Sequence, residues 1–356
     1  MTPPVTIEPV RADMYAPLAD FNAHFEGETR PIEFWMARFR LWWDDNPAWD
    51  ADAGRGWALI ASGCIVGFVG LFPSYFQLNG VRTRAWISTT WRVHGTHRGD
   101  SLKLMRAVVT GAKDELLFST TAKPEIAPVM QVLGYRRMPA LGGRRRLLVV
   151  DAARFTSVLG VSAVTAMVRV LAPVVRNVHR RVFSPFASPR VEVRQVHAAD
   201  GAFDELWNRT RSQYPTATVR DASWVNWQCF ANRWYAKEVV AAYDGSRLRG
   251  FAVAMVADWK GGLKILDCVD LWYDFADVHV AAALVRGLGD IAVARNCHVV
   301  QVPHFNEAIG KALAGKALLN ANREAIVGYW RGPKPLMDSP TVQGAYLTLI
   351  EGDRFL

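Results

Sequence analysis

Hydrophobic and polar positions follow the same order twice along this chain. In the first block, apolar runs at Trp57–Ser62 and Cys64–Phe76 are separated by Gly63, and both runs are typical of buried strands. Asn79-Gly80 then predicts a tight hairpin turn, because both central positions of such a turn need a positive φ. Val81–Val93 is therefore expected to be a third strand.

After this strand the pattern changes to helical spacing. Gly95–Gly99 is a polar loop, and Asp100–Glu115 places its apolar residues on one helix face. A short strand, a second helix and a closing strand are expected to complete the block, at Leu116–Thr121, Pro124–Leu133 and Arg145–Val150.

The second block repeats this order. Strands at Val239–Tyr243 and Leu248–Asp258 enclose a turn, and Gly261-Gly262 precedes a third strand at Leu263–Trp272. A helix, a strand and a second helix follow at Ala276–Arg295, His298–Val302 and Asn306–Ala317, and two final strands are expected after them. Such repetition indicates two duplicated domains of the mixed α/β class, each with a twisted mixed sheet flanked by helices. We expect the domains to cover residues 1–150 and 191–356, joined by a connector at 151–190.

The positive charge of the chain is concentrated around this connector. Residues 136–190 contain eleven arginines and one acid, a net charge of +10, whereas the whole chain carries +9. A general basic surface for nucleic acid is therefore not expected. Valines at helical spacing predict an amphipathic helix in the connector, but Arg169 and Pro173 inside it argue against a membrane span. Two interpretations stay open: a linker helix packed across both domains, or a surface for anionic lipid headgroups or an acidic carrier protein.

Composition narrows the class of protein further. The apolar fraction of 51% and the 14 tryptophans are sufficient for two cores in 356 residues. The four cysteines have no CxxC spacing, so neither a metal site nor a disulfide framework is expected. The first residues, Met1-Thr2-Pro3-Pro4, do not resemble a signal peptide. A cytoplasmic protein is expected, with peripheral membrane contact as an open option.

A strand, a glycine-containing loop and a helix start follow one another between Val93 and Met105. At such a junction the free amide groups of the first helical turn and the helix dipole favour a bound phosphate. The candidate phosphate-binding residues are Val93, Arg98, Gly99, Asp100, Ser101, Leu102 and Lys103.

This segment, with Leu133-Gly134-Tyr135 at the exit of the next helix, resembles the GCN5-related N-acetyltransferase (GNAT) family. The likeness is greatest to tandem acyltransferase-type proteins found with bacterial surface-polysaccharide and glycolipid biosynthesis. The resemblance implies a coenzyme A thioester, acetyl-CoA or a longer acyl-CoA, as co-substrate and no metal. It also implies that Thr120 and Thr121 line the pantetheine arm, although both threonines could instead cap the helix after Pro124.

The chain departs from the family pattern at its acid and base positions. Met130 stands where the family usually has a tyrosine acid, and Lys103 stands at a small-residue position of the loop. His94 and Asp267 are therefore the candidate catalytic residues, because each can accept a proton near a strand end. An incidental exposed histidine and a solvated strand-end carboxylate are the alternative interpretations. The second block has no phosphate loop after its third strand.

These observations favour an enzyme that transfers an acyl group, N- or O-linked, to an amine or hydroxyl of a small-molecule or saccharide acceptor. Acyl-carrier protein stays open as the donor, because it delivers the arm itself and its acidic surface would suit the basic connector. Two alternatives remain: a non-catalytic GNAT-like recognition protein, and a FemAB-like aminoacyl transferase.

Overall fold

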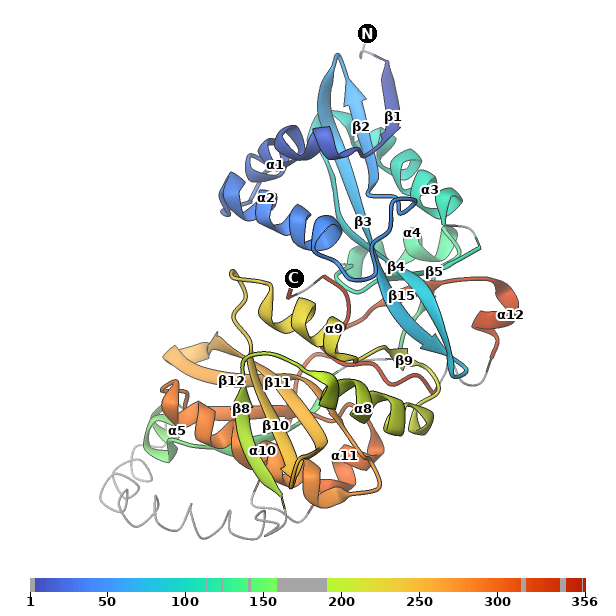
Figure 1. Cartoon of the computed structure of the whole chain (residues 1–356). Helices are drawn as coiled ribbons and strands as arrows, with labels where there is room; N and C mark the ends of the chain where they lie inside the picture. The colour runs from blue at the N-terminus through green and yellow to red at the C-terminus, as the bar shows by residue number, and fades with distance from the viewer. Residues whose placement is uncertain are drawn as a thin grey trace.

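The computed structural model describes residues 4–112, 114–122, 124–139, 142–158, 191–314, 318–339, 344–353 and 355–356. These residues form two mixed sheets, each flanked by helices. Figure 1 shows the first half of the chain in blue and teal, next to the second half in yellow and orange. The predicted mixed α/β class is confirmed.

The first sheet has the strand order β1-β2-β3-β4-β5-β15-β6, with β9 paired to β3. Its strands are β1 Val5–Pro9, β2 Gly56–Ala61, β3 Cys64–Leu78, β4 Val81–Val93, β5 Leu116–Ser119, β15 Tyr329–Arg331, β6 Arg136–Arg137 and β9 Ala217–Thr218. The β3–β4 hairpin turns at Asn79 and Gly80, whose φ values of 52° and 80° confirm the turn predicted from the sequence. The helices of this half are α1 Tyr15–Ala23, α2 Ile32–Phe39, α3 Ser101–Gly111 and α4 Ala127–Val132.

The second sheet has the order β14-β7-β13-β12-β11-β10-β8. Its strands are β14 Leu319–Asn322, β7 Arg144–Val149, β13 Val299–Pro303, β12 Leu263–Tyr273, β11 Arg247–Trp259, β10 Glu238–Asp244 and β8 Glu192–Val196. The helices are α8 Gly201–Thr210, α9 Ala222–Val225, α10 Val278–Ala294, α11 Glu307–Ala312 and α12 Lys334–Met337. The repeated order of three strands, helix, strand and helix is thus present in both halves.

Among the described strands, each sheet is antiparallel except at one equivalent place. β4 pairs in parallel with β5 from Ala85–Leu116 to Ile87–Phe118, and β12 pairs in parallel with β13 from Ile265–Val299 to Asp267–Gln301. Three residue pairs form each ladder, so the strands part soon after they meet. Each sheet therefore has a splay between a long strand and the short strand that follows the main helix.

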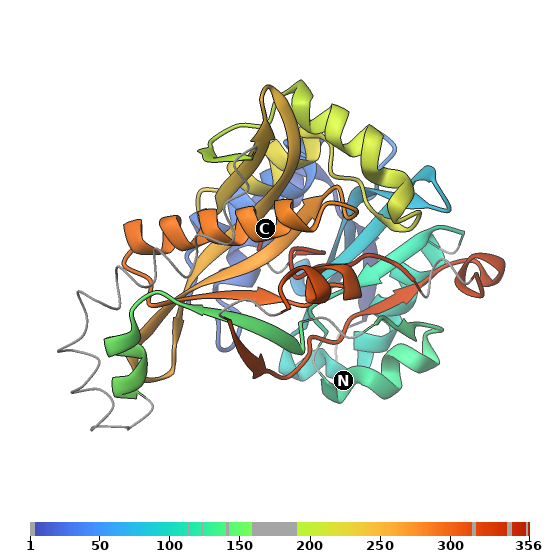
Figure 2. The same cartoon turned by 90° about the horizontal axis from the view of Figure 1, so that it is seen from below.

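Two strands are exchanged between the halves. The strand expected at Arg145–Val150 to close the first block is β7, but it pairs with β13 and β14 of the second sheet. In return, β15 from the end of the chain pairs with β5 and β6 of the first sheet. In Figure 2 the green strand β7 runs beside the orange strand β13. The predicted division at 1–150, 151–190 and 191–356 stays a prediction, and the exchange ties its two outer parts together.

The two halves also share one hydrophobic core. The rings of Phe72 on β3 and Trp227 from the second half lie 6.1 Å apart, and the Trp227 indole donates a hydrogen bond of 2.7 Å to the Leu41 carbonyl. Trp35, Trp42 and Trp43 are all buried in this core. A site between the halves therefore has firm walls on both sides.

The connector is described in part. α5 covers Ala152–Val158, and the predicted amphipathic helix beyond it lies outside the described residues. In the part of the chain that the structure does describe, none of the helices has the length and apolar character needed to cross a bilayer.

Candidate active site

A cavity of about 590 Å³ opens where β4 and β5 part. Ser88 and the four residues that follow it on β4 line one side, and Ser119 and Thr121 line the other. The remaining wall comes from α3, from the α1–α2 region and from two segments of the second half, and its side chains include Met105, Arg30, Trp35, Arg38, Tyr235 and Asp353. The cavity thus occupies the splay of the first sheet and reaches the boundary between the halves.

A bulge in β4 shapes this wall. The register of the β3–β4 ladder shifts between Phe68 and Gly70, and Thr90 opposite this shift has a φ of 53°. A β-branched residue in the left-handed region is strained and persists when its surroundings hold it there. Bulges beside active sites re-aim side chains and interrupt ladder hydrogen bonds. Here the bulge lies directly in the cavity wall, next to Thr89 and Trp91.

One end of the cavity is the N-terminus of α3. Ser101, the first residue of α3, and Met105 one turn later line the cavity, together with Ile126. A 3-10 turn, Gly95–Asp100, runs directly into α3, and the Ser101 amide donates to the Arg98 carbonyl. The positive end of the helix dipole therefore favours an anion at this end of the cavity.

The predicted phosphate loop surrounds this helix start. Arg98, Gly99 and Lys103 are exposed, and the Lys103 ammonium lies 2.6 Å from the Asp100 carboxylate. Leu102 is half-buried, and Val93 is part of the core below the loop. Among the predicted binding residues, Ser101 and Thr121 line the large cavity, while Thr120 lines a smaller one on the other side. The assignment of these residues to a donor site stays a prediction.

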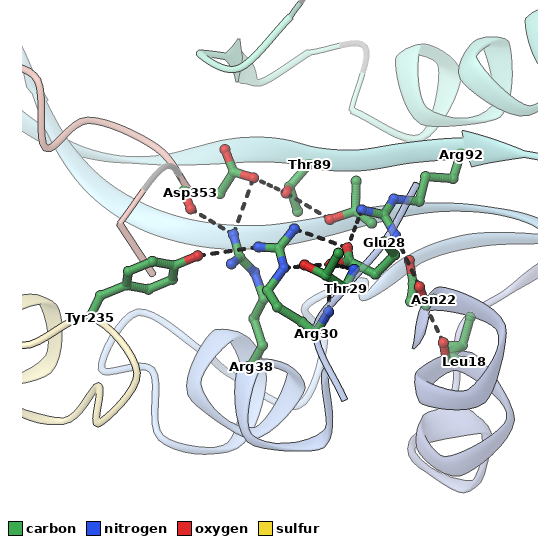
Figure 3. A network of polar contacts seen from close by, with 11 residues as sticks. Leu18, Asn22, Glu28, Thr29, Arg30, Arg38, Thr89, Arg92, Tyr235 and Asp353 are labelled. Atoms are coloured by element: carbon green, nitrogen blue, oxygen red, sulfur yellow. Dashed lines mark hydrogen bonds and ion pairs between the residues drawn. The ribbon is translucent and has the colours of Figure 1, made fainter. Parts of the chain in front are cut away.

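The other end of the cavity is a cluster of arginines. Arg30, Arg38 and Arg92 all line it, and each guanidinium lies within 6 Å of the Trp35 ring. Glu28 lies between two of them: its carboxylate is 2.7 Å from Arg30 Nε and 2.6 Å from Arg92 Nη2 (Figure 3). Burial alone would raise the pKa of Glu28, but the hydrogen bonds from Arg30 and Arg92 lower it to about 2.

Asp353 reaches the middle of the cavity from the far end of the sequence. Its carboxylate accepts hydrogen bonds from the hydroxyls of Thr89 and Thr121, the second at 3.0 Å. Arg38 Nη2 donates a 2.7 Å hydrogen bond to the Asp353 carbonyl and lies 3.5 Å from the carboxylate (Figure 3). Asp353 is 5% exposed. A carboxylate is therefore held at the point where β4 and β5 separate.

Tyr235 closes the cavity from the second half. Its hydroxyl accepts a 3.2 Å hydrogen bond from Arg30 Nη1 (Figure 3), and Phe34 packs between Tyr235 and the exposed ring of Trp234. Sequence reasoning missed Arg30, Arg38, Tyr235 and Asp353. The local pattern held no signal for them, because their contacts join residues more than two hundred positions apart.

The two predicted catalytic residues lie outside the cavity wall. His94 is exposed, and its Nδ1 lies 2.9 Å from the Thr96 hydroxyl. Asp267 is on β12 in the second sheet, where it contacts Arg145 Nη1 at 3.2 Å and accepts a 2.8 Å hydrogen bond from Gln301. Burial raises the pKa of Asp267 despite these two partners. Their catalytic role stays a prediction, and the cavity brings neither of them to Asp353. Within the described ranges, no cluster of three or more metal-ligating side chains occurs.

The splay of the second sheet is filled by protein. The Ile350 amide donates to the Val269 carbonyl at 3.1 Å, so the segment that leads to Asp353 lies along β12. Below it, the fully buried Arg220 bonds to Asp270 at 3.0 Å and to Glu351 at 3.0 Å. The segment at Ile350 therefore occupies the splay of the second sheet, and its end, Asp353, lies in the cavity of the first sheet.

The two splayed sheets and the exchanged strands define a GNAT-type fold in tandem. No protein-family model matches the chain, and no curated protein matches it in sequence. Solved structures do match: a probable N-acyltransferase from Enterococcus faecalis has a TM-score of 0.59 at 12% identity, covering 92% of this chain and 72% of its own. A GCN5-related N-acetyltransferase from Anabaena variabilis has a TM-score of 0.58 at 9% identity, with the same coverage.

The likeness extends to a larger enzyme. N-myristoyltransferase from Saccharomyces cerevisiae, solved with myristoyl-CoA, has a TM-score of 0.53 at 12% identity and covers 92% of this chain and 79% of its own. Both halves of the chain are included in these matches. At such identities the matches establish the fold.

Proposed function

We propose that this chain is an acyltransferase of the GNAT type. It transfers an acyl group from a thioester donor, acyl-CoA or acyl-carrier protein, to an amine or hydroxyl of a small-molecule or saccharide acceptor. The observation that carries the proposal is one continuous cavity, which joins the N-terminus of α3 to the Asp353 carboxylate at the strand splay. A cytoplasmic location, with a peripheral contact to anionic lipid through the basic residues at 136–190, belongs to the same proposal.

The α3 end of the cavity suits the donor. The Ser101 side chain and the positive end of the α3 dipole can attract a phosphate, while Val69, Met105 and Ile126 give an apolar surface for an arm and acyl chain. The names of the structural neighbours support an acyl donor, since they include an N-acyltransferase and an enzyme with bound myristoyl-CoA. The thioester supplies an activated acyl carbon. The bulge at Thr90 supplies backbone groups, freed from the ladder, that can polarise its carbonyl.

The acceptor enters from the boundary between the halves, where Tyr235 and the arginine cluster form the wall. Asp353 accepts the proton that the amine or hydroxyl loses as its new bond to the acyl carbon forms. The carbon–sulfur bond breaks, and the sulfur leaves on the α3 side as a thiolate, which then takes up a proton from solvent. The hydroxyls of Thr89 and Thr121 orient the carboxylate for this step.

Donor binding is tested by calorimetry with acetyl-CoA, a long-chain acyl-CoA and acyl-carrier protein. The Ser101→Trp variant fills the α3 end and is expected to weaken donor binding at least about tenfold with an unchanged melting temperature. Thr110→Trp, at the exposed far end of the same helix, is the matched control and should bind as the wild type does. Absence of saturable binding by all three donors would reject the proposal.

A further inference from the structure

The cavity wall next to the arginine cluster holds polar atoms without partners. Trp35 Nε1 and Arg38 Nε are buried, and neither of them meets a hydrogen-bond acceptor among the described residues. Both side chains line the cavity. Each of these atoms is a donor, and a buried donor left unpaired is costly. The wall is therefore matched to a ligand that brings acceptor oxygens.

The net positive charge of this wall also favours a ligand with anionic oxygens. Three guanidinium groups, those of Arg30, Arg38 and Arg92, meet two carboxylates, those of Glu28 and Asp353. Glu28 is shared by Arg30 and Arg92, and Asp353 is shared by Arg38 and two threonine hydroxyls. The described part of the cluster keeps an excess of one positive charge in a place largely shielded from water.

Arg38 is the arginine best placed to bind an anionic ligand with this excess positive charge. It is 7% exposed and is held by the rings of Phe34, Trp35 and Trp42 at 4.9–5.8 Å. A guanidinium fixed in this way is preorganised for the two oxygens of a carboxylate or phosphate group. Since Arg38 also contacts Asp353, an acceptor anchored at Arg38 presents a neighbouring amine or hydroxyl to the Asp353 carboxylate.

We infer that the acceptor carries an anionic oxygen group, a carboxylate or a phosphate, which binds at Arg38 beside Trp35. That this ligand is an acceptor rests on the proposed acyl transfer, but its binding at the anion site can be tested without any donor. Carboxylate and phosphate share the same recognition chemistry, and the choice between them is made by the probes below.

The test uses matched pairs of charged and neutral probes in equilibrium binding to the full chain. N-acetylglycine is compared with N-acetylglycinamide for the carboxylate, and glucose 6-phosphate with glucose for the phosphate. We expect saturable binding of at least one charged probe and none of its neutral partner. Arg38→Gln should weaken that binding about 10- to 100-fold, the loss of a charged hydrogen-bonded pair.

Two further variants keep the result interpretable. Arg40→Gln removes an exposed arginine two positions away and should leave binding unchanged. Arg38→Lys retains the charge but not the two-pronged hydrogen bonding of the guanidinium, and it is expected to bind the charged probe with intermediate affinity. It replaces Arg38→Gln in the test if that variant fails to fold. Equal binding of charged and neutral probes, or charged binding that neither Arg38 variant weakens, overturns the inference.

A competition experiment separates this site from the donor site. With CoA at saturation, the charged probe should still bind. If CoA displaces it and Arg38→Gln also weakens CoA itself, the arginines belong to the donor and the inference is wrong. If the probe binds through Arg38 but no thioester binds in any assay, the anion site stands and the proposed acyl transfer fails.

Discussion

Gly352 lies so close to Thr120 that a Cβ atom on Gly352 would stand 1.8 Å from the Thr120 hydroxyl oxygen. Its φ of 80° is also in the left-handed region that favours glycine. The next residue is Asp353, which bonds to Thr89 and Thr121 on the two sides of the strand splay. The close approach of Gly352 to Thr120 is therefore what allows the chain to place this carboxylate inside the cavity.

Replacing the carboxylate itself tests its role. Asp353→Asn keeps the size of the side chain but removes the proton acceptor, so we expect kcat to fall about 100-fold or more. Donor affinity should stay close to that of the wild type, because Ser101 and Met105 form the other end of the cavity. Steady-state kinetics with a thiol-release assay measures the first value and calorimetry the second. A kcat within about threefold of wild type would show that Asp353 orders the segment without taking part in the chemistry.

Gly352→Ala moves the carboxylate without removing it. The added Cβ meets Thr120 and forces the backbone out of its left-handed conformation, so Asp353 leaves its place between the threonines. We expect a loss of about 1–3 kcal/mol in the free energy of unfolding and at least a tenfold fall in kcat. Urea denaturation and the same kinetic assay measure both.

The hairpin glycine provides the matched control. Gly80 has the same φ of 80°, but a Cβ there would meet nothing within 4 Å. Gly80→Ala is therefore expected to cost about 1 kcal/mol in stability and to leave kcat unchanged. Equal effects of the two substitutions on kcat would mean that the contact with Thr120 does not position Asp353.

The arginine cluster makes a prediction about acid stability. Glu28 has a folded-state pKa of about 2, below the value of 4.5 for a free side chain, so its stabilising effect is present above pH 4.5 and is lost as the pH falls toward 2. Glu28→Gln should therefore be less stable than the wild type by about 2 kcal/mol at pH 7. That difference should shrink between pH 4.5 and pH 2. Denaturation midpoints across this range measure it.

Glu33→Gln is the control for this pH dependence. Glu33 is exposed in the first turn of α2, five residues before Arg38 along the chain. The stability of the Glu33→Gln variant should follow the wild-type stability curve between pH 7 and pH 2. A Glu28→Gln difference that stays constant from pH 7 to pH 2 would mean that the carboxylate is not paired with Arg30 and Arg92.

The repeated strands and helices of both halves could be predicted because their signals are local. Asn79-Gly80 predicts a turn because both residues tolerate a positive φ. The switch to helical spacing after Val93 predicts α3. The partner of a strand is not a local property. The apolar residues of β7 suit burial in either sheet, and its partner β13 lies about 150 positions further along the chain, beyond the reach of a local pattern.

The site divides in the same way. Ser101 and Thr121 are visible to sequence reasoning, since each belongs to a short local pattern, and both residues line the cavity; their role in donor binding stays a prediction. Arg38 and Asp353 are not visible to it, because they are 315 positions apart and meet through the segment that fills the second splay. A carboxylate near the end of a sequence has no distinguishing pattern until the fold brings threonines and an arginine to it.

The anchoring of the same segment makes a last prediction, at alkaline pH. The Lys237 ammonium donates a 2.6 Å hydrogen bond to the Phe355 carbonyl, two residues beyond Asp353, and the side chain is buried. Burial is the main cause that lowers the pKa of Lys237 from 10.5 to about 8, and the charge of nearby Arg38 contributes to the same shift. Between pH 8 and 10.5 the unfolded chain thus binds more protons than the folded one, so stability contributed by this group rises with pH.

Lys237→Met removes the titrating group and keeps most of its volume. The stability of the wild type relative to this variant should therefore increase by about 3 kcal/mol between pH 7.5 and pH 10.5. Urea denaturation at several pH values in this range measures the difference, and Lys264→Met, which removes an exposed lysine from β12, should show no such trend. Because Lys237 holds Phe355, kcat of the Lys237→Met variant should also fall while donor affinity stays unchanged. Parallel pH curves for wild type and variant would mean that Lys237 is solvated and does not anchor the segment that carries Asp353.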